Sequence, residues 1–131
     1  MNMTQKYIEG DIVEYDNKIM VVKEPRDGSH FDLSCPKEGL VYCFVGVDEV
    51  RPVRITPEIL EKNGWRTQNR WYYYLDVAEG FISYIGIDFK HKSNKGHLYV
   101  EVDGNNMVEI RYCHELQHLL FGLGLNSEME V

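Results

Sequence analysis

The first third of the chain alternates short hydrophobic stretches with polar turns. The candidate strands are DIVEY (11–15), KIMVVKE (18–24), HFDLS (30–34) and LVYCFVGV (40–47). Asp16 and Asn17 separate the first two strands and are typical of a tight hairpin turn. Pro25, Asp27 and Gly28 favour a second turn. Several short strands in so short a segment predict a small SH3-like barrel.

The segment ITPEILEKNGW (55–65) carries the clearest helix signals. Thr56 can cap the helix, Pro57 suits its first position and Glu58 complements the helix dipole. Gly64 can adopt the left-handed conformation that ends a helix. We place the boundary between the two halves of the chain here, which predicts domains at 1–55 and 56–131; these could also form one compact unit.

The second half is rich in aromatic and β-branched residues. Its candidate strands are RWYYYLDV (70–77), GFISYIGIDFK (80–90), HLYVEVD (97–103) and MVEIRY (107–112). Asp103 and Gly104 mark a hairpin, so we expect an antiparallel β-meander. An amphipathic helix from about Tyr112 to Leu123, ended by Gly124, is expected to cover it. The predicted fold class is therefore α+β, mainly antiparallel β, with an SH3-like N-terminal barrel followed by a β-meander packed by a C-terminal helix.

The C-terminal segment YCHELQHLLFGLGL contains the pattern His-Glu-x-x-His. On a helix, His114 and His118 lie one turn apart on the same face and could bind one zinc ion. Glu115 could then act as general base on a metal-bound water. The pattern therefore raises the hypothesis of a zinc metallopeptidase.

A catalytic zinc of this kind needs a third protein ligand. The extended motif places a glycine and a third histidine where this chain has Phe121 and Gly124. Only Glu128 and Glu130 follow, and His91 or His97 would have to come from a hairpin. We therefore favour a helix without a metal or catalytic residue.

The helical wheel gives this segment two faces. One face carries a stripe of leucines, namely Leu116, Leu119, Leu120 and Leu123. The other carries His114, His118, Phe121 and Leu125. At about 100° per residue these faces are nearly opposite, so the leucines should pack on the sheet and the histidine side should face solvent or a partner. The second set is our candidate partner interface, for a second subunit or another protein.

Three segments together resemble a family of small uncharacterised proteins encoded by bacterial prophages and mobile elements. They are EGDIVEYDNKIMVVKE, VDEVRPVRITPEILEKNGW and MVEIRYCHELQHLLFGL, and the resemblance runs from about Gly10 to Leu125. It implies no activity or ligand. In the family, glutamine and asparagine typically stand at the positions of Glu115 and His118, so the resemblance implies a helix without a zinc site. The segment PRDGSHFDLSCPKEG and the strands after Trp71 are longer here.

Composition narrows the remaining choices. The net charge of −7 repels phosphate and disfavours a nucleic-acid-binding module, although Lys90, Lys92 and Lys95 gather in one hairpin. Three cysteines, an odd number, favour free thiols and a reducing compartment. With no signal peptide and no long apolar run, we expect a cytoplasmic protein that does not bind membranes.

The aromatic run WYYYL (71–75) has two interpretations. It could form a stacking platform for bases or sugars. We favour a strand with aromatic residues on both faces, buried between the barrel and the final helix. The leading functional hypothesis is a non-enzymatic interaction module that needs no cofactor, with the zinc peptidase and the nucleic-acid-binding module as alternatives.

Overall fold

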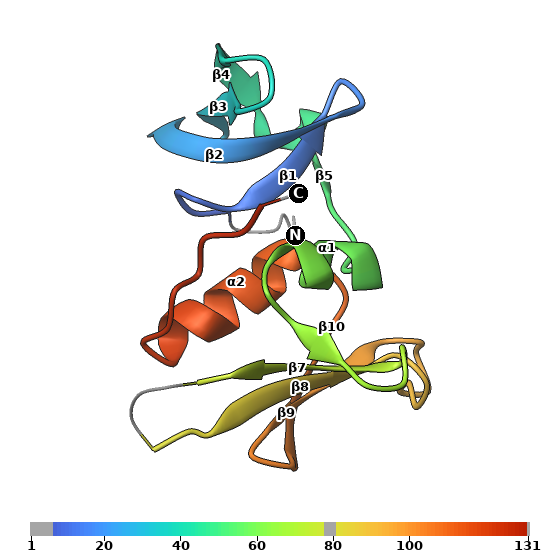
Figure 1. The fold of residues 1–131 in the computed structure, drawn as a ribbon. Coiled ribbons are helices and arrows are strands. Elements are labelled where there is room, and N and C mark those ends of the chain that lie inside the picture. Colours follow the sequence, from blue (N-terminus) through green and yellow to red (C-terminus); the bar gives the residue numbers. More distant parts are fainter. Residues whose placement is uncertain (1–6, 78–80, 131) are drawn as a thin grey trace. The chain divides into compact units, whose positions relative to one another are not determined.

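The computed structural model describes residues 7–77 and 81–130, which fall into two units with one five-stranded antiparallel sheet each (Figure 1). The first unit contains the described residues up to Arg54 together with Tyr112–Met129, and the second contains those from Ile55 to Arg111. The predicted class, α+β with mainly antiparallel strands, is confirmed.

The first sheet has the strand order β4-β3-β2-β1-β5. Its elements are β1 (Ile12–Tyr15), β2 (Lys18–Asp27), β3 (His30–Cys35), β4 (Leu40–Gly46), the 3₁₀ turn η1 (Val47–Glu49) and β5 (Arg51–Pro52). Asp16 and Asn17 have φ angles of 53° and 61°, as the tight turn between β1 and β2 requires. The core of the sheet consists of Val13, Met20, Val22, Phe31, Leu33, Cys35, Val45 and Val50.

The predicted closure of this sheet into a barrel is not found. In the described part of the chain β4 and β5 remain the two edges of the sheet, and no ladder joins them. The pairing of β2 with β3 shifts register on both sides of Pro25, a residue that lacks the N–H needed for a regular ladder. Because β2 runs through this irregularity to Asp27, the turn expected at Pro25 begins only at Gly28.

The second unit begins with α1 (Pro57–Lys62) and continues with the second sheet, in the order β10-β9-β8-β7-β6. The strands are β6 (Arg66–Thr67), β7 (Tyr72–Asp76), β8 (Tyr84–Asp88), β9 (Leu98–Val102) and β10 (Asn105–Ile110). Thr56 caps α1 by accepting the Ile59 N–H at 3.3 Å, and Gly64 has a φ angle of +88°, so both predicted helix signals are confirmed.

Helix α2 (Cys113–Gly122) belongs to the first unit. The Cys113 N–H donates to the Val53 carbonyl at 2.7 Å, and further α2 side chains bond to residues 10–12. The sequence analysis placed this helix in the segment 56–131, whereas here it groups with the first unit; the chain changes units near Arg54. Periodicity finds a helix but does not tell which sheet its side chains bond to.

No helix in residues 7–77 and 81–130 is both long enough and apolar enough to cross a membrane.

Candidate functional site

Helix α2 uses the glutamate of the His-Glu-x-x-His segment to close its own first turn. Glu115 Oε1 accepts the Tyr112 N–H at 2.9 Å. Such a bond satisfies one of the N–H groups that have no partner at the start of a helix, and a negative charge is favoured there by the helix dipole. The carboxylate expected as a general base is thus held at the helix N-terminus.

The second histidine of the segment is bound to a buried aspartate of the N-terminal strand region. His118 Nε2 lies 3.0 and 2.9 Å from the two carboxylate oxygens of Asp11, which is 1% exposed. Asp11 also accepts the Ile8 N–H at 2.8 Å. Since a carboxylate at hydrogen-bonding distance accepts, Nε2 of His118 carries the proton. The His118 side chain keeps 36% of its surface exposed.

The first histidine is enclosed by aromatic rings. His114 is 5% exposed, and its ring centroid lies 5.0 Å from that of Tyr7, 5.9 Å from that of Tyr112 and 5.6 Å from that of His118. Burial lowers the pKa of His114 and outweighs the nearby carboxylates, so the imidazole is neutral. Among the described residues its buried Nδ1 has no hydrogen-bond partner.

Gln117, between the two histidines, ties three backbone segments together. Its Oε1 accepts the Ile12 N–H at 2.9 Å, and its Nε2 donates to the carbonyls of Gly10 and Ser127 at 2.8 and 3.1 Å. The side chain is 3% exposed. Buried backbone groups need partners, and this amide supplies three of them at once. Neither Asp11 nor Gln117 was singled out from the sequence, since their partners lie more than 100 positions away.

The histidine side of α2, which the sequence analysis expected to face solvent or a partner, is covered in part by the first unit itself. His114 is buried and His118 is held by Asp11 within the first unit. Of the four interface candidates, Phe121 is 68% exposed, while Leu125 is partly buried and donates its N–H to the Leu120 carbonyl. The helical wheel sorts residues by face but does not say which face the rest of the unit covers.

Beside this face lies a hollow of about 390 Å³ in the first unit, which we call the Phe121 hollow. Its polar wall contains Asp11, Gln117 and His118, and its apolar rim contains Ile8 and Phe121. Ile8 and Phe121 are 46% and 68% exposed. The hollow is completed by Glu9, Gly10, Ser127 and Glu128. A recess with a few converging polar groups and an apolar rim has the size and character of a binding site.

A zinc site at this place would need a third donor besides the two imidazoles. In the part of the chain that the structure describes, no three histidine, cysteine, aspartate or glutamate side chains are grouped to hold a metal ion. The suggested upstream donors lie in the second unit, where His91 is 2.9 Å from Asp88 and His97 is 3.4 Å from Glu109. The geometry described here does not supply the tetrahedral set that zinc requires.

The three cysteines are free thiols. Burial raises the pKa of Cys113 to about 12, so this thiol stays protonated beside the Arg54 carbonyl, 3.8 Å from its Sγ. A thiol in this state is a poor nucleophile, which argues against a Cys-His catalytic pair at residues 113 and 114. Cys43 is exposed and Cys35 is buried.

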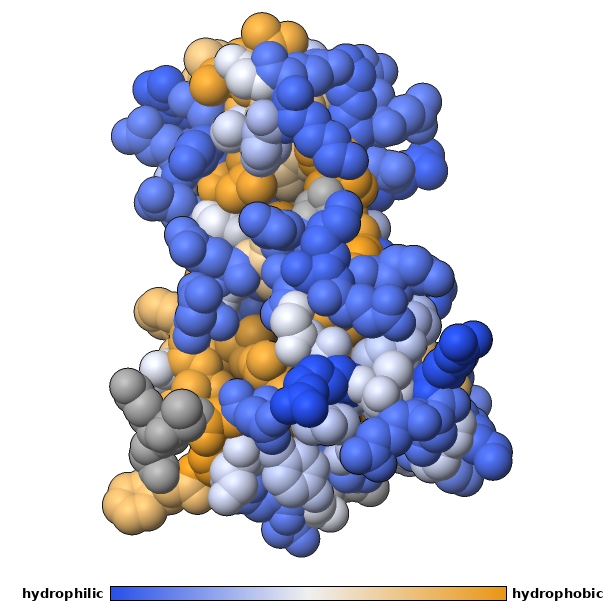
Figure 2. Space-filling view, viewed as in Figure 1, coloured by the Kyte–Doolittle hydropathy of each residue, from blue (hydrophilic) through white to orange (hydrophobic). Residues whose placement is uncertain are grey.

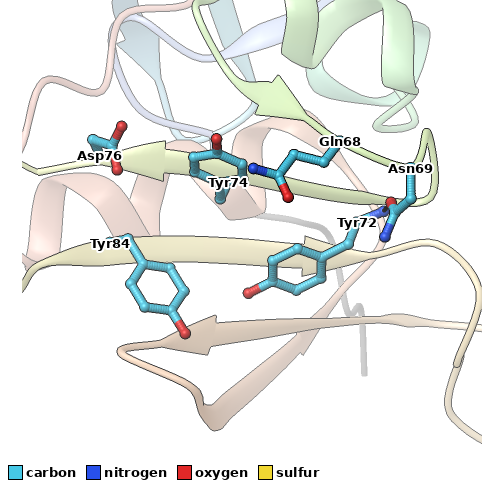
Figure 3. A pocket seen from close by; sticks show the side chains of 6 residues that line it. All are labelled: Gln68, Asn69, Tyr72, Tyr74, Asp76 and Tyr84. Atoms are coloured by element: carbon cyan, nitrogen blue, oxygen red, sulfur yellow. Dashed lines mark hydrogen bonds between the residues drawn. The ribbon is translucent and has the colours of Figure 1, made fainter.

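A second recess lies on the second sheet (Figure 3). Its volume is about 330 Å³, and its lining consists of Gln68, Asn69, Tyr72, Tyr74, Asp76 and Tyr84. The three tyrosines are partly buried, whereas Tyr73 between two of them points to the other face and is 2% exposed. The expectation of aromatic residues on both faces of this strand is confirmed. We call this recess the tyrosine groove.

Part of the basic hairpin contacts its own neighbours. The Lys90 ammonium group lies 5.3 Å from the centroid of the Trp71 ring, and the Trp71 ring also contacts His91 edge-on. With His91 held by Asp88, this loop places carboxylate, imidazole and ammonium groups side by side. Lys92 and Lys95 of the same hairpin are exposed.

Comparison of the chain with protein-family models, with curated proteins and with solved structures found no match.

Proposed function

We propose that the protein is a non-enzymatic interaction module whose partner-binding surface is the Phe121 hollow of the first unit. The observation that carries the proposal is the combination of an apolar rim, Ile8 and Phe121, with a hollow whose polar wall is already hydrogen-bonded. Exposed aromatic residues beside a recess are typical of protein interfaces.

The engagement of the polar residues supports a binding role over a catalytic one. Glu115 caps its helix and His118 donates to Asp11. A catalytic base needs access to a substrate proton, whereas these groups fix the shape of the unit.

The partner that this surface fits is a second copy of the chain. The same patch holds both a protruding ring, Phe121, and the recess beside it. Under two-fold symmetry each copy can place its ring in the recess of the other, because such an interface is self-complementary. Figure 2 shows hydrophilic side chains over much of one face, with apolar areas between them.

Sedimentation velocity over a range of protein concentrations tests this proposal. We expect a concentration-dependent dimer for the native chain and a monomer for Phe121→Ser. The matched control is Phe81→Ser, which removes another exposed ring, in the second unit, and should dimerise like the native chain. A native chain that stays monomeric, or equal behaviour of the two variants, would contradict the proposal.

Three further proposals concern the fold relationship, the origin and the compartment. The strand order β4-β3-β2-β1-β5, with η1 between β4 and β5, supports an SH3-like relationship for the first unit. The resemblance in sequence supports an origin in a bacterial prophage or mobile element. The free thiols support a reducing, cytoplasmic setting.

A second candidate function is the zinc peptidase with His114 and His118 as ligands and Glu115 as general base. One observation favours it, namely the buried Nδ1 of His114, which has no partner among the described residues. Elemental analysis after incubation with zinc tests it. Stoichiometric zinc that is lost in His118→Asn would support the peptidase, and protein free of zinc would remove it.

A further inference from the structure

The tyrosine groove lies on the outward face of the second sheet and is built from alternate residues. Tyr72, Tyr74 and Asp76 alternate along β7, and Tyr84 opposes Asp76 on β8. Figure 3 shows the Tyr84 ring extending from β8 and the Tyr72 ring crossing β8, with Tyr74 and Gln68 at β7. Because side chains alternate between the faces of a strand, one face of the sheet presents these groups together.

A glycine makes room for one wall of the groove. A Cβ atom at Gly86 would collide with the Tyr72 ring, so the ring lies directly over the backbone of β8. The Tyr72 hydroxyl donates to Glu101 Oε1 at 2.9 Å. Burial and the Glu101 carboxylate both raise the pKa of Tyr72, so the hydroxyl stays protonated and the ring is held in place.

The charge around the groove is negative. Asp76 lines it, Glu101 anchors the Tyr72 hydroxyl, and Asp103 accepts the backbone N–H groups of Ser83 and Tyr84. Arg66 is the cation that contacts these lining residues in the described part of the chain. Carboxylates beside electron-rich aromatic faces attract cations and repel phosphate and other anions.

Arg66 demonstrates within the chain what this surface can bind. Its guanidinium carbon lies 5.8 Å from the centroid of the Tyr74 ring, and its Nη1 lies 3.4 Å from Asp76 Oδ2. A planar guanidinium can stack on a tyrosine and donate to a carboxylate at the same time. Arg66 uses only the Oδ2 atom of Asp76, so among the described residues Oδ1 is left for a second guanidinium, beside the ring of Tyr84 that opposes Asp76 on β8.

We propose that the tyrosine groove is a binding site for an arginine side chain of a basic peptide segment in a protein partner. The guanidinium stacks on the ring of Tyr84 and donates to Asp76 Oδ1, while the carbonyl of Gln68 accepts from its outer edge. A groove of about 330 Å³ that is open to solvent receives a side chain from an extended segment without enclosing the whole ligand. This site is separate from the Phe121 hollow and does not depend on it.

The ligand pair that tests the proposal is a blocked glycine-flanked arginine peptide and the same peptide with citrulline. Citrulline keeps the shape and removes the charge. Titration of the isotope-labelled full chain, followed by amide NMR shifts, should show saturable changes at Tyr72, Tyr74, Asp76 and Tyr84 with the arginine peptide. The citrulline peptide should bind at least about tenfold more weakly, which corresponds to about 1.4 kcal/mol.

Two variants and one matched control separate a built site from general attraction to an acidic protein. Asp76→Asn and Tyr84→Leu should each weaken arginine binding several-fold. Asp48→Asn removes the same charge from an exposed position in the first unit and should leave affinity unchanged. Since Asp76 is exposed, its replacement keeps the fold, and Tyr84→Phe preserves the ring and should preserve binding.

Four results would overturn the proposal. The first is equal affinity for the arginine and citrulline peptides, and the second is an equal loss of binding in Asp76→Asn and Asp48→Asn. The third is a set of shifts that appears with a neutral oligosaccharide but not with the arginine peptide. The fourth is the absence of saturable shifts with any of these probes.

Discussion

The strongest prediction from the structure concerns Gln117, the buried amide that joins three backbone segments. Gln117→Ala removes the acceptor for the Ile12 N–H and the donor to the carbonyls of Gly10 and Ser127. A hydrogen bond contributes about 1 kcal/mol net, and a buried group left unpaired costs at least as much. We therefore expect a loss of about 3 kcal/mol in the free energy of unfolding.

Two measurements check this value. With a urea dependence of about 2 kcal/mol per molar, the midpoint followed by far-ultraviolet circular dichroism should fall by about 1.5 M. Hydrogen exchange at the Ile12 amide should accelerate about a hundredfold, since that amide loses its acceptor. The exchange measurement reports on the first unit directly. Tryptophan fluorescence would report on the second unit, because both tryptophans, Trp65 and Trp71, lie there.

The control is Gln68→Ala, which removes the same side chain from an exposed position. Its stability should change by less than about 0.5 kcal/mol. Gln117→Glu gives a second check, because one carboxylate oxygen would face two carbonyl oxygens. The loss of stability relative to the native chain should be larger at neutral pH than in acid, where the carboxyl regains a proton to donate. If Gln117→Ala were as stable as Gln68→Ala, the bridging role inferred for this amide would be refuted.

Three further predictions concern the helix ends and His114. Thr56→Ala should lower stability by about 1 kcal/mol because the Ile59 N–H loses its cap, while Thr56→Ser should retain it; thermal unfolding of the two variants decides this. Gly64→Ala should lower the stability of the protein by about 1 kcal/mol, because an alanine is strained at a φ angle of +88°. Its control is Gly122→Ala, in the last turn of α2 with open space around it, which should be neutral or stabilising in the same unfolding assay. Burial lowers the pKa of His114 from its ordinary 6.5. Below pH 6.5 the unfolded chain therefore binds a proton that the folded chain does not. Stability should fall as the pH decreases from 6.5 to the lower pKa of the folded state. Urea titrations at about pH 7.5 and about pH 5.5 should show a smaller difference for His114→Phe than for the native chain, and an unchanged difference would contradict the assignment.

Local signals in the sequence determined the secondary structure well. Asp16 and Asn17 in one hairpin, Asp103 and Gly104 in another, and Thr56 at the start of α1 act through their immediate neighbours. Turn and cap chemistry depends on a few adjacent residues, so it can be read without knowing the fold. The α+β class and the antiparallel strands were also predicted from such local patterns.

The identity of the candidate site was decided by tertiary structure. The sequence singled out His114 and His118 for their spacing, but their environment comes from Tyr7 and Asp11, more than 100 positions earlier. Whether a histidine faces solvent, a metal or a buried carboxylate depends on which segment packs against its helix.

The tyrosine groove also depends partly on local sequence and partly on tertiary structure. Alternation along β7 predicts that Tyr72 and Tyr74 share a face opposite to Tyr73. Only the register that sets Gly86 under the Tyr72 ring and Glu101 at its hydroxyl turns that face into a recess. The turns that join β7 to β8 and β8 to β9 are long, so the register of these strands depends on how their side chains pack and is not fixed by a short turn motif.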